Sequence, residues 1–328
     1  MTRAEPAIVS VRRLENQEIL EALADELGKR TQSWIGDRAT VFVTGSIARG
    51  EATRHSDLDA FLVTTDASVD EATRRRFRED LAAAAEAAEA PLPELRDDRR
   101  YEHTLDELVA KMGTDAEDVE NQLTTRLLLL LESRALVNPA VHAACVEKVV
   151  DRYFRVHPFH ENDFLPIVLV NDIVRYWRLM LLAYEEKNSR GTIAPEERHL
   201  RSYKLRFSRC LLCYSVLLPL LAEARGKGRI ERDFADALFR KQPLERLASL
   251  RLDLEREVDI VAIVAAMEQC YARFLELSDE PKAARLERFR DPSYARERSR
   301  EATEFGNLVY RLALRLGLES PLFRYLVV

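Results

Sequence analysis

The chain has 328 residues, of which 47% are apolar and 8% aromatic, a composition typical of globular proteins and not of disordered or fibrous ones. Its net charge of −6 argues against a general nucleic-acid coat protein, because such proteins carry a basic excess. No segment approaches the roughly 20 apolar residues of a transmembrane helix, and the N-terminus lacks the apolar stretch of a signal peptide. We therefore expect a cytoplasmic protein with no membrane partner, long enough for two domains.

The first third of the chain alternates between helical and strand patterns. Apolar residues at helical spacing predict an amphipathic helix, and an alanine-rich segment predicts a second one. Short runs of β-branched and aromatic residues between them predict buried strands. The expected elements are a helix over 11–34, strands over 40–43 and 58–63, a helix over 70–90 and a strand-like stretch within 92–103. These elements predict a small α/β domain over residues 1–113.

From residue 114 onward the pattern is helical to the end of the chain. Thr114 and Glu117 fit a capping box at the start of a long helix. Further helices are expected over 140–154, 164–187, 201–225, 231–239, 244–277 and 294–316. The expected fold class is therefore α+β, with the α/β domain followed by a helical bundle domain over residues 114–328.

A small, polar, turn-prone segment separates the two predicted strands. Gly45 and Ser46 stand where the first strand ends, and Asp57 and Asp59 stand where the second begins. Alternate residues of a strand share a face with Cα atoms about 6.6 Å apart, so the two carboxylates project together. Oxygen ligands without His or Cys favour a hard cation, Mg²⁺ first and Mn²⁺ as a substitute. The sequence thus predicts a metal site at Asp57 and Asp59.

The same segment supplies candidates for phosphate binding. Gly45 lets the backbone approach a ligand closely, so that backbone amides and the Ser46 hydroxyl can face a phosphate. Arg49 lies in the same turn and is placed to pair with a triphosphate. Far along the chain, Arg201 and Lys204 share a helix face in a stretch of five cations without an acid. They are expected to bind phosphates of the nucleotide or acceptor, with a solvated or acid-paired face as the alternative.

The pattern G-S, ten residues and D-x-D resembles the signature of the polymerase β nucleotidyltransferase superfamily. R-G-E before S-D-x-D is similar to the nucleotidyltransferase domain of bacterial PII-uridylyltransferases, as are the segment 103–107, Asp118 and L-E-S-R at 131–134. The segments N-D-I-V-R-Y-W-R and K-L-R-F-S-R resemble uncharacterised bacterial nucleotidyltransferase-domain proteins. Ser46 stands where the uridylyltransferases have glycine, and their phosphohydrolase and sensor domains have no room here. PII modification is therefore not implied.

The resemblance implies transfer of a nucleoside monophosphate from an NTP to a hydroxyl acceptor, with release of pyrophosphate. It also implies a third carboxylate from a later strand. By chain order the candidates are Asp98 and Asp97, then Glu94, with Asp118 and Asp172 next. NTP and metal are expected in a cleft between the two domains.

Two questions about function stay open in the sequence. The acceptor could be a protein hydroxyl, an RNA end, a small molecule or a second nucleotide. The alternative function is a catalytically inactive nucleotide-binding regulator that acts through its helical domain.

Overall fold

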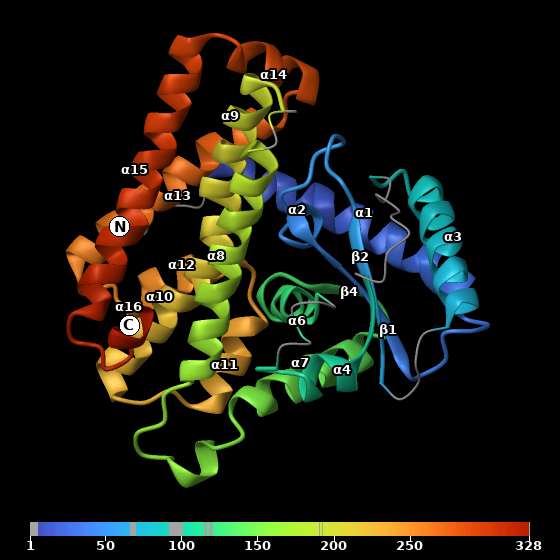
Figure 1. The fold of residues 1–328 in the computed structure, drawn as a ribbon, viewed down its shortest axis with the longest axis horizontal. Coiled ribbons are helices and arrows are strands. Elements are labelled where there is room, and N and C mark those ends of the chain that lie inside the picture. The colour runs from blue at the N-terminus through green and yellow to red at the C-terminus, as the bar shows by residue number, and fades with distance from the viewer. Residues whose placement is uncertain are drawn as a thin grey trace. The chain divides into compact units, whose positions relative to one another are not determined.

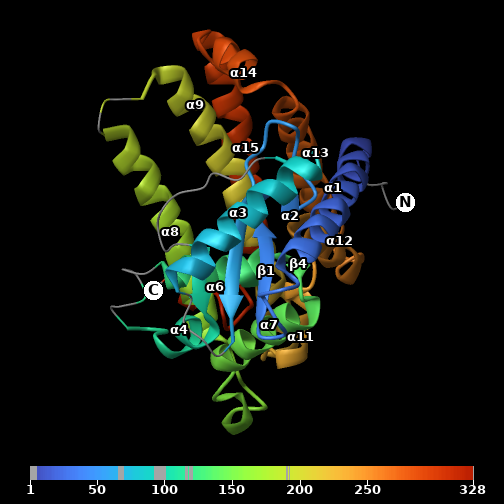
Figure 2. The same cartoon turned by 90° about the vertical axis from the view of Figure 1, so that its right-hand side faces the viewer.

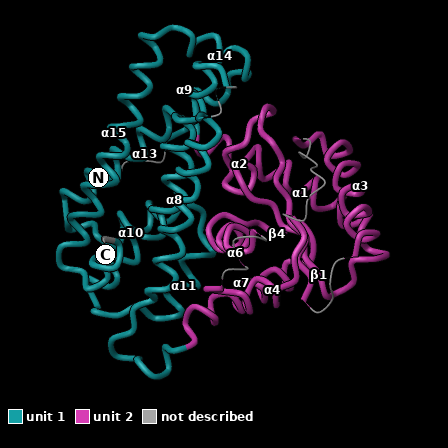
Figure 3. The backbone as a smooth tube through the Cα atoms, in the orientation of Figure 1, with its two compact units in different colours: residues 1–8, 156–328 teal, residues 9–155 magenta. Residues whose placement is uncertain are grey.

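The computed structural model describes residues 6–65, 70–91, 101–114, 117, 121–189, 191 and 193–327. The chain divides into two compact units (Figure 3): residues 9–155, here the sheet unit, and residues 156–328 with the first eight residues, here the helical unit. The prediction of an N-terminal α/β domain followed by a largely helical region is confirmed. The compact units separate after residue 155 and not at 113/114, because the segment between these positions completes the sheet and its helical cover.

A mixed four-stranded sheet forms the centre of the sheet unit (Figure 1). The strand order is β3-β2-β1-β4, in which β1 pairs antiparallel with β2 and β4, and β2 pairs parallel with β3. The register places Thr44 opposite Asp59 and Phe42 opposite Phe61. The strands are β1 (Ala39–Thr44), β2 (Asp59–Thr64), β3 (Glu102–Thr104) and β4 (Arg134–Val137).

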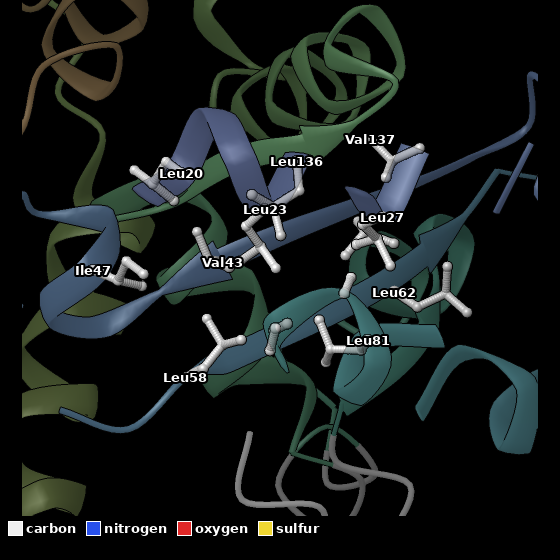
Figure 4. Packing of buried hydrophobic residues seen from close by; sticks show 14 of the residues in the cluster. Leu20, Leu23, Leu27, Val43, Ile47, Leu58, Leu62, Leu81, Leu136 and Val137 are labelled. Carbon is white, nitrogen blue, oxygen red and sulfur yellow. The ribbon is translucent and has the colours of Figure 1, made fainter. Parts of the chain in front are cut away.

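Helices α1 and α3 cover one face of this sheet (Figure 2). Leu23 and Leu27 of α1 pack over Val43 and Leu62 of the strands, and Leu81 of α3 joins the same core (Figure 4). The apolar stripe of α1 faces the alternate apolar residues of β1 and β2, which explains why both periods are visible in the sequence. The described helices of this unit are α1 (Ala7–Thr31), α2 (Gly45–Ala48), α3 (Glu71–Ala87), α4 (Leu105–Ala110), α6 (Gln122–Leu131) and α7 (Pro139–Tyr153).

The opposite face of the sheet packs against α7 through aromatic rings. The rings of Phe42 and Phe61 stack with centroids 5.3 Å apart, and His142 of α7 meets Phe42 edge-on at 5.6 Å. Because side chains alternate along β2, Asp59 lies on the face of Phe61 and not on the face of the α1–α3 core. The sheet thus separates its main apolar core from the face that carries Asp59.

Strand β4 was not predicted, since the chain was expected to be helical from residue 114. Its four residues are too short to show a period, and the strand is specified by pairing with β1. The Thr40 hydroxyl adds a hydrogen bond of 2.7 Å to the carbonyl oxygen of Val137. A strand defined by long-range contacts gives little local signal.

The predicted capping box at Thr114 and Glu117 is also wrong. The Thr114 hydroxyl donates to the carbonyl of Lys111 at 2.8 Å. The capping box lies ten residues earlier, where Thr104 and Glu107 exchange side-chain and backbone hydrogen bonds at the start of α4. Both pairs fit the T-x-x-E pattern, so the pattern alone could not choose between them.

The regular elements described in the helical unit are all helices. The predicted helix over 244–277 is interrupted near Glu257, whose φ of −93° and ψ of 83° are not helical, and no Gly or Pro announces this break. Helix α14 was not predicted. The elements are η2 (His157–Phe159), α8 (Ile167–Ser189), α9 (Pro195–Lys204), η3 (Leu205–Arg209), α10 (Cys210–Lys227), α11 (Arg232–Phe239), α12 (Pro243–Asp253), α13 (Val258–Ser278), α14 (Lys282–Phe289), α15 (Pro292–Gly317) and α16 (Arg324–Val327).

Helix α9, the π-helical turn η3 and α10 form one continuous stretch, Pro195–Lys227. By length and composition it could cross a membrane, although no run of that kind was expected from the sequence. Of its most apolar window, 78% is buried inside the protein. Burial of this extent is usual for the core helix of a globular bundle.

The burial of His142 leads to a prediction about acid stability. Burial lowers the pKa of His142 to about 4, whereas an unfolded histidine titrates near 6.5. Since protons bind the unfolded chain first, this contribution to stability is complete above pH about 6.5 and decreases towards pH 4, by at most about 1.4 kcal/mol per pH unit. We expect urea denaturation to show that the free energy of unfolding falls less between pH 7 and pH 4.5 in His142→Gln than in the wild type.

Other groups also titrate in this range, so the difference between variants is the informative quantity. His55 is exposed, and His55→Gln serves as the control that should follow the wild-type profile. If His142→Gln and the wild type lose stability in parallel, burial of His142 does not cause the acid sensitivity.

Candidate functional site

The glycine turn at the end of β1 lies directly against the Asp59 carboxylate. Gly45 has a φ of +76°, which favours glycine. A Cβ atom added to Gly45 would lie 3.4 Å from Oδ2 of Asp59. Ser46 follows in α2 and is half-buried. The fold therefore brings the G-S pair and one carboxylate of D-x-D together, with the backbone of the turn at close range.

Burial alternates through the segment that carries the two aspartates. Asp57 is exposed, Leu58 is only 2% exposed within the α1–α3 core, and Asp59 is half-buried at the first position of β2. A hydrogen-bonded turn precedes them, in which the backbone amide of Thr53 donates to the Ser56 hydroxyl at 3.0 Å. Burial of Leu58 thus anchors this segment while both neighbouring carboxylates keep contact with solvent. A ligand can reach them there.

Arg49 has two carboxylate partners within the protein. Its side chain is 5% exposed, and its Nε donates to Glu51 at 2.8 Å. Its Nη1 pairs with Glu132, and both glutamate side chains are buried. The sequence suggested an arginine available to a triphosphate, but the guanidinium is engaged by these two acids. Contact between Arg49 and a triphosphate stays a prediction.

The Arg49 triad, defined as Arg49, Glu51 and Glu132, joins two motifs that are 83 residues apart. R-G-E contributes the first two members, and L-E-S-R at the end of α6 contributes the third. The sequence resemblance rested on both motifs without indicating that they touch. One feature of the sequence could have indicated this contact. Glu132 directly follows the apolar run LLLLL, and an acid at a buried position needs a partner.

Helix α1 holds the other side of the loop that follows α2. The Asn16 side chain is fully buried and bonds both backbone groups of Ala52, donating to its oxygen and accepting from its amide at 3.0 Å each. Arg12 donates to the carbonyl of Glu51 at 3.2 Å. Gly50 has a φ of +69°, and a Cβ there would lie 3.4 Å from Cα of Arg13. The loop is therefore fixed against α1.

The sequence analysis did not identify Arg12 and Asn16. They precede Leu20 at four-residue intervals and so occupy the buried face of α1. Polar residues at such positions need hydrogen-bond partners, and this could have indicated that both residues support another part of the chain. Their partners lie in a loop about 40 residues later, which periodicity alone does not reveal.

The nucleotide-binding candidates of α9 belong to the helical unit. Arg201 donates to Glu197 at 2.8 Å, one helical turn away, and Lys204 is exposed. Ser208, four residues after Lys204, lies in the π-helical turn η3, where the helical phase shifts. The alternative of an acid-paired face is thus present at Arg201. Phosphate binding by Arg201 and Lys204 stays a prediction.

Asp172, the last candidate for the third carboxylate, has an ion-pair partner on its own helix. It forms an ion pair with Arg175 at 3.9 Å on α8, and Trp177 packs edge-on against Tyr214 with ring centroids 6.4 Å apart. Asp172 and the Asp57–Asp59 pair belong to different compact units.

Four candidates for the third carboxylate lie outside the residues that the structure describes, namely Glu94, Asp97, Asp98 and Asp118. Within the described residues, no group of three or more His, Cys, Asp or Glu side chains is arranged to hold a metal ion.

Glu102 of β3 is described, but it does not complete the pair of aspartates. It pairs in register with Leu62, whose side chain belongs to the α1–α3 core. Its carboxylate approaches Arg74 and Arg78 of α3 at 3.9 and 3.6 Å. Glu102 therefore faces away from the side of the sheet that carries Asp59.

Comparison with known families identifies the class of this fold. Residues 20–109 match the family described as "Nucleotidyltransferase domain", so this part of the chain is a polymerase β-like nucleotidyltransferase domain. The match contains Gly45, Ser46, Asp57 and Asp59. A comparison with curated proteins gives no match, and the finer similarity to PII-uridylyltransferases has no support from a named relative.

The matched region leaves out much of what holds the site. Arg12 and Asn16 precede residue 20, and Glu132 follows residue 109. The loop between the glycine turn and the aspartates is thus supported by residues that lie outside the nucleotidyltransferase match on both sides.

The Arg49 triad leads to a prediction about stability. Arg49→Met leaves two buried glutamates without their cation, and we expect the free energy of unfolding to fall by about 3–5 kcal/mol in urea denaturation. The triple variant Arg49→Met, Glu51→Gln, Glu132→Gln removes the charges together and should recover a large part of this loss. Arg75→Met is the control, because Arg75 is exposed and pairs with the exposed Glu79.

An equal loss in the single and triple variants would mean that packing, and not the uncompensated charge, causes the destabilisation. A change below about 0.5 kcal/mol in Arg49→Met, as expected for an ordinary surface site, would contradict the buried ion-pair assignment.

Proposed function

We propose that this protein transfers a nucleoside monophosphate from an NTP to a hydroxyl acceptor, with Asp57 and Asp59 as metal ligands. The observation that carries the proposal is the close approach of the Gly45 turn to the Asp59 carboxylate within a nucleotidyltransferase domain. A phosphate-binding backbone beside a metal-binding carboxylate is what nucleotidyl transfer requires.

The donor set fits a hard divalent cation, the kind that polymerase β-like nucleotidyltransferases generally use. Asp57 and Asp59 offer only oxygen ligands, which suit Mg²⁺ or Mn²⁺. When bound there, the ion would neutralise triphosphate charge and polarise the α phosphate. The half-buried position of Asp59 and the exposed position of Asp57 leave room for water and phosphate oxygens to complete the coordination.

The binding of the leaving pyrophosphate and the deprotonation of the acceptor are assigned to the Gly45 turn and to residues predicted from the sequence. Backbone amides of the Gly45 turn and the Ser46 hydroxyl would hold oxygens of the leaving pyrophosphate. A third carboxylate, for which Asp98 is our first candidate, would accept the proton of the acceptor hydroxyl as its oxygen attacks the α phosphorus. Arg201 and Lys204 remain candidates for binding nucleotide or acceptor phosphates.

A nucleotide-binding regulator without catalysis is the second candidate. The observation that favours it is the engagement of Arg49 by Glu51 and Glu132, because a guanidinium that already pairs with two acids has fewer donors to offer a triphosphate. Incubation with each α-labelled NTP, Mg²⁺ and cell lysate distinguishes the two, because an enzyme labels an acceptor and releases pyrophosphate. Binding of NTP without any labelled product or pyrophosphate would favour the regulator.

The metal assignment predicts that Asp57→Asn with Asp59→Asn abolishes the Mg²⁺-dependent part of NTP binding, which isothermal titration calorimetry measures with and without Mg²⁺. The amides keep the shape of the side chains but lose the charge that a divalent cation requires. Asp37→Asn, at an exposed position outside the site, is the control that should bind as the wild type does. Unchanged Mg²⁺-dependent binding in the double variant would overturn the assignment.

The third carboxylate is tested separately, by pyrophosphate release from the variants Glu94→Gln, Asp97→Asn and Asp98→Asn. We expect one of them, Asp98→Asn first, to lose most of the turnover while NTP binding persists, because a general base acts on the acceptor and not on the nucleotide. Turnover preserved in all three would place the base elsewhere.

A further inference from the structure

The loop that follows α2 is buried, which is unusual for a connecting segment. Residues 45–52 are all buried except Ser46, which is half-buried. Connecting segments normally run over the surface of a protein, because buried backbone amides and carbonyls need hydrogen-bond partners. The buried loop, defined here as residues 49–52, therefore depends on partners from neighbouring elements.

Two buried side chains of α1 supply such partners. The Asn16 side chain is fully buried and bonds both backbone groups of Ala52, at 3.0 Å each. Its nitrogen also donates to the carbonyl of Arg12 at 2.8 Å, which fixes the orientation of the amide within the helix. The Arg12 guanidinium is buried as well and donates to the carbonyl of Glu51 at 3.2 Å. Helix α1 thus holds the backbone of two successive loop residues.

The buried loop is in turn bonded to the predicted phosphate-binding turn. The backbone amide of Glu51 donates to the carbonyl of Ser46 at 2.8 Å. Glu51 is therefore held on both sides, with its carbonyl on Arg12 and its amide on Ser46. A chain of hydrogen bonds runs from the buried face of α1 to the residue whose hydroxyl is a candidate phosphate ligand.

Helix α1 also contacts the second motif of the Arg49 triad. The Gln17 side chain accepts a hydrogen bond of 2.8 Å from Arg134, at the start of β4. Arg134 belongs to L-E-S-R, which also contains Glu132 of the triad. Residues 12–17 of α1 therefore support R-G-E through the carbonyl of Glu51 and L-E-S-R through Arg134.

We propose that Arg12 and Asn16 are positioning residues of the nucleotide site, which hold the turn of Gly45 and Ser46 in the shape that binds the phosphates of an NTP. Their role rests on the proposed function, in which this turn holds the triphosphate. Both side chains are buried, so they act through the loop and do not touch the ligand. Binding groups that are already held in place lose less freedom when a ligand arrives. Because both residues precede the nucleotidyltransferase match, the site depends on a segment outside the matched region.

The test measures NTP binding by the full-length variant Asn16→Leu, by calorimetric titration with each NTP and Mg²⁺. Leucine has a similar volume but makes no hydrogen bond, so both backbone groups of Ala52 lose their partner. We expect the Kd for NTP to rise about tenfold or more, as is usual when residues that orient a binding site are replaced. Arg12→Met removes the donor to Glu51 and should raise the Kd in the same direction. It decides the test if Asn16→Leu does not fold.

Leu27→Ala is the matched control, which separates positioning of the site from overall stability. Leu27 is fully buried in the same helix and lies near Leu62 and Val137, away from Ile47 of α2 (Figure 4). Truncation of a buried leucine lowers the free energy of unfolding, which urea denaturation measures in every variant. We expect Leu27→Ala to lose stability and still bind NTP with the Kd of the wild type under conditions in which it is folded.

Hydrogen exchange adds a measurement that needs no ligand. The backbone amides of Glu51 and Ala52 are hydrogen-bonded to Ser46 and Asn16, so they should exchange slowly in the wild type. In Asn16→Leu we expect these two amides to exchange faster, by a larger factor than the amides of β1 and β2, because the loop opens locally. Leu27→Ala should not show this local difference.

Each remaining outcome contradicts the proposal in a recognisable way. An unchanged Kd in the folded variants, an equal rise in Leu27→Ala, or a rise without faster exchange in the loop would overturn the positioning role alone. If the wild type binds no NTP, the proposed function fails and the positioning role fails with it.

Discussion

The buried ion pairs of Arg49 determine how the candidate site is built. Two carboxylates and one guanidinium are withdrawn from water together, which is costly unless the three groups are held in good geometry. Glu51 comes from the loop after the glycine turn, and Glu132 comes from the end of α6. The triad can form only when the turn has its native shape and β4 is in place beside β1. The triad therefore depends on both the turn and the sheet.

The two faces of the sheet have different roles, because successive side chains of β2 point to opposite faces. Leu58, Ala60 and Leu62 enter the core under α1 and α3, so the position of β2 is set by apolar packing. Asp59 then faces the other side, next to the close-packed backbone of Gly45. Carboxylates placed by a rigid strand are better positioned for a metal than carboxylates on a free loop. Two nearby carboxylates repel each other, and the apolar packing of the residues between and after them holds the strand in place despite this repulsion.

The main elements of the sheet unit and the candidate metal ligands could be predicted from the sequence, because short segments of the chain carry the information. The periods of α1 and α3, the β-branched runs of β1 and β2, and the G-S and D-x-D spacing are all contained within short windows. What escaped prediction depends on distant contacts: β4 exists because it pairs with β1, and Arg49 meets Glu132 across 83 residues. The break between α12 and α13 has no Gly or Pro, so only packing defines it. Motif spacing identified the chemistry, but it could not show that one motif residue is already paired.

Arg49 and Arg285 show how the surroundings decide the meaning of a buried charge. Both guanidiniums are almost removed from water, yet Arg49 contacts two acids and Arg285 contacts none among the described residues. A paired charge fixes the structure around it, because any movement exposes an uncompensated partner. The paired arrangement of Arg49 therefore suits the support of a site.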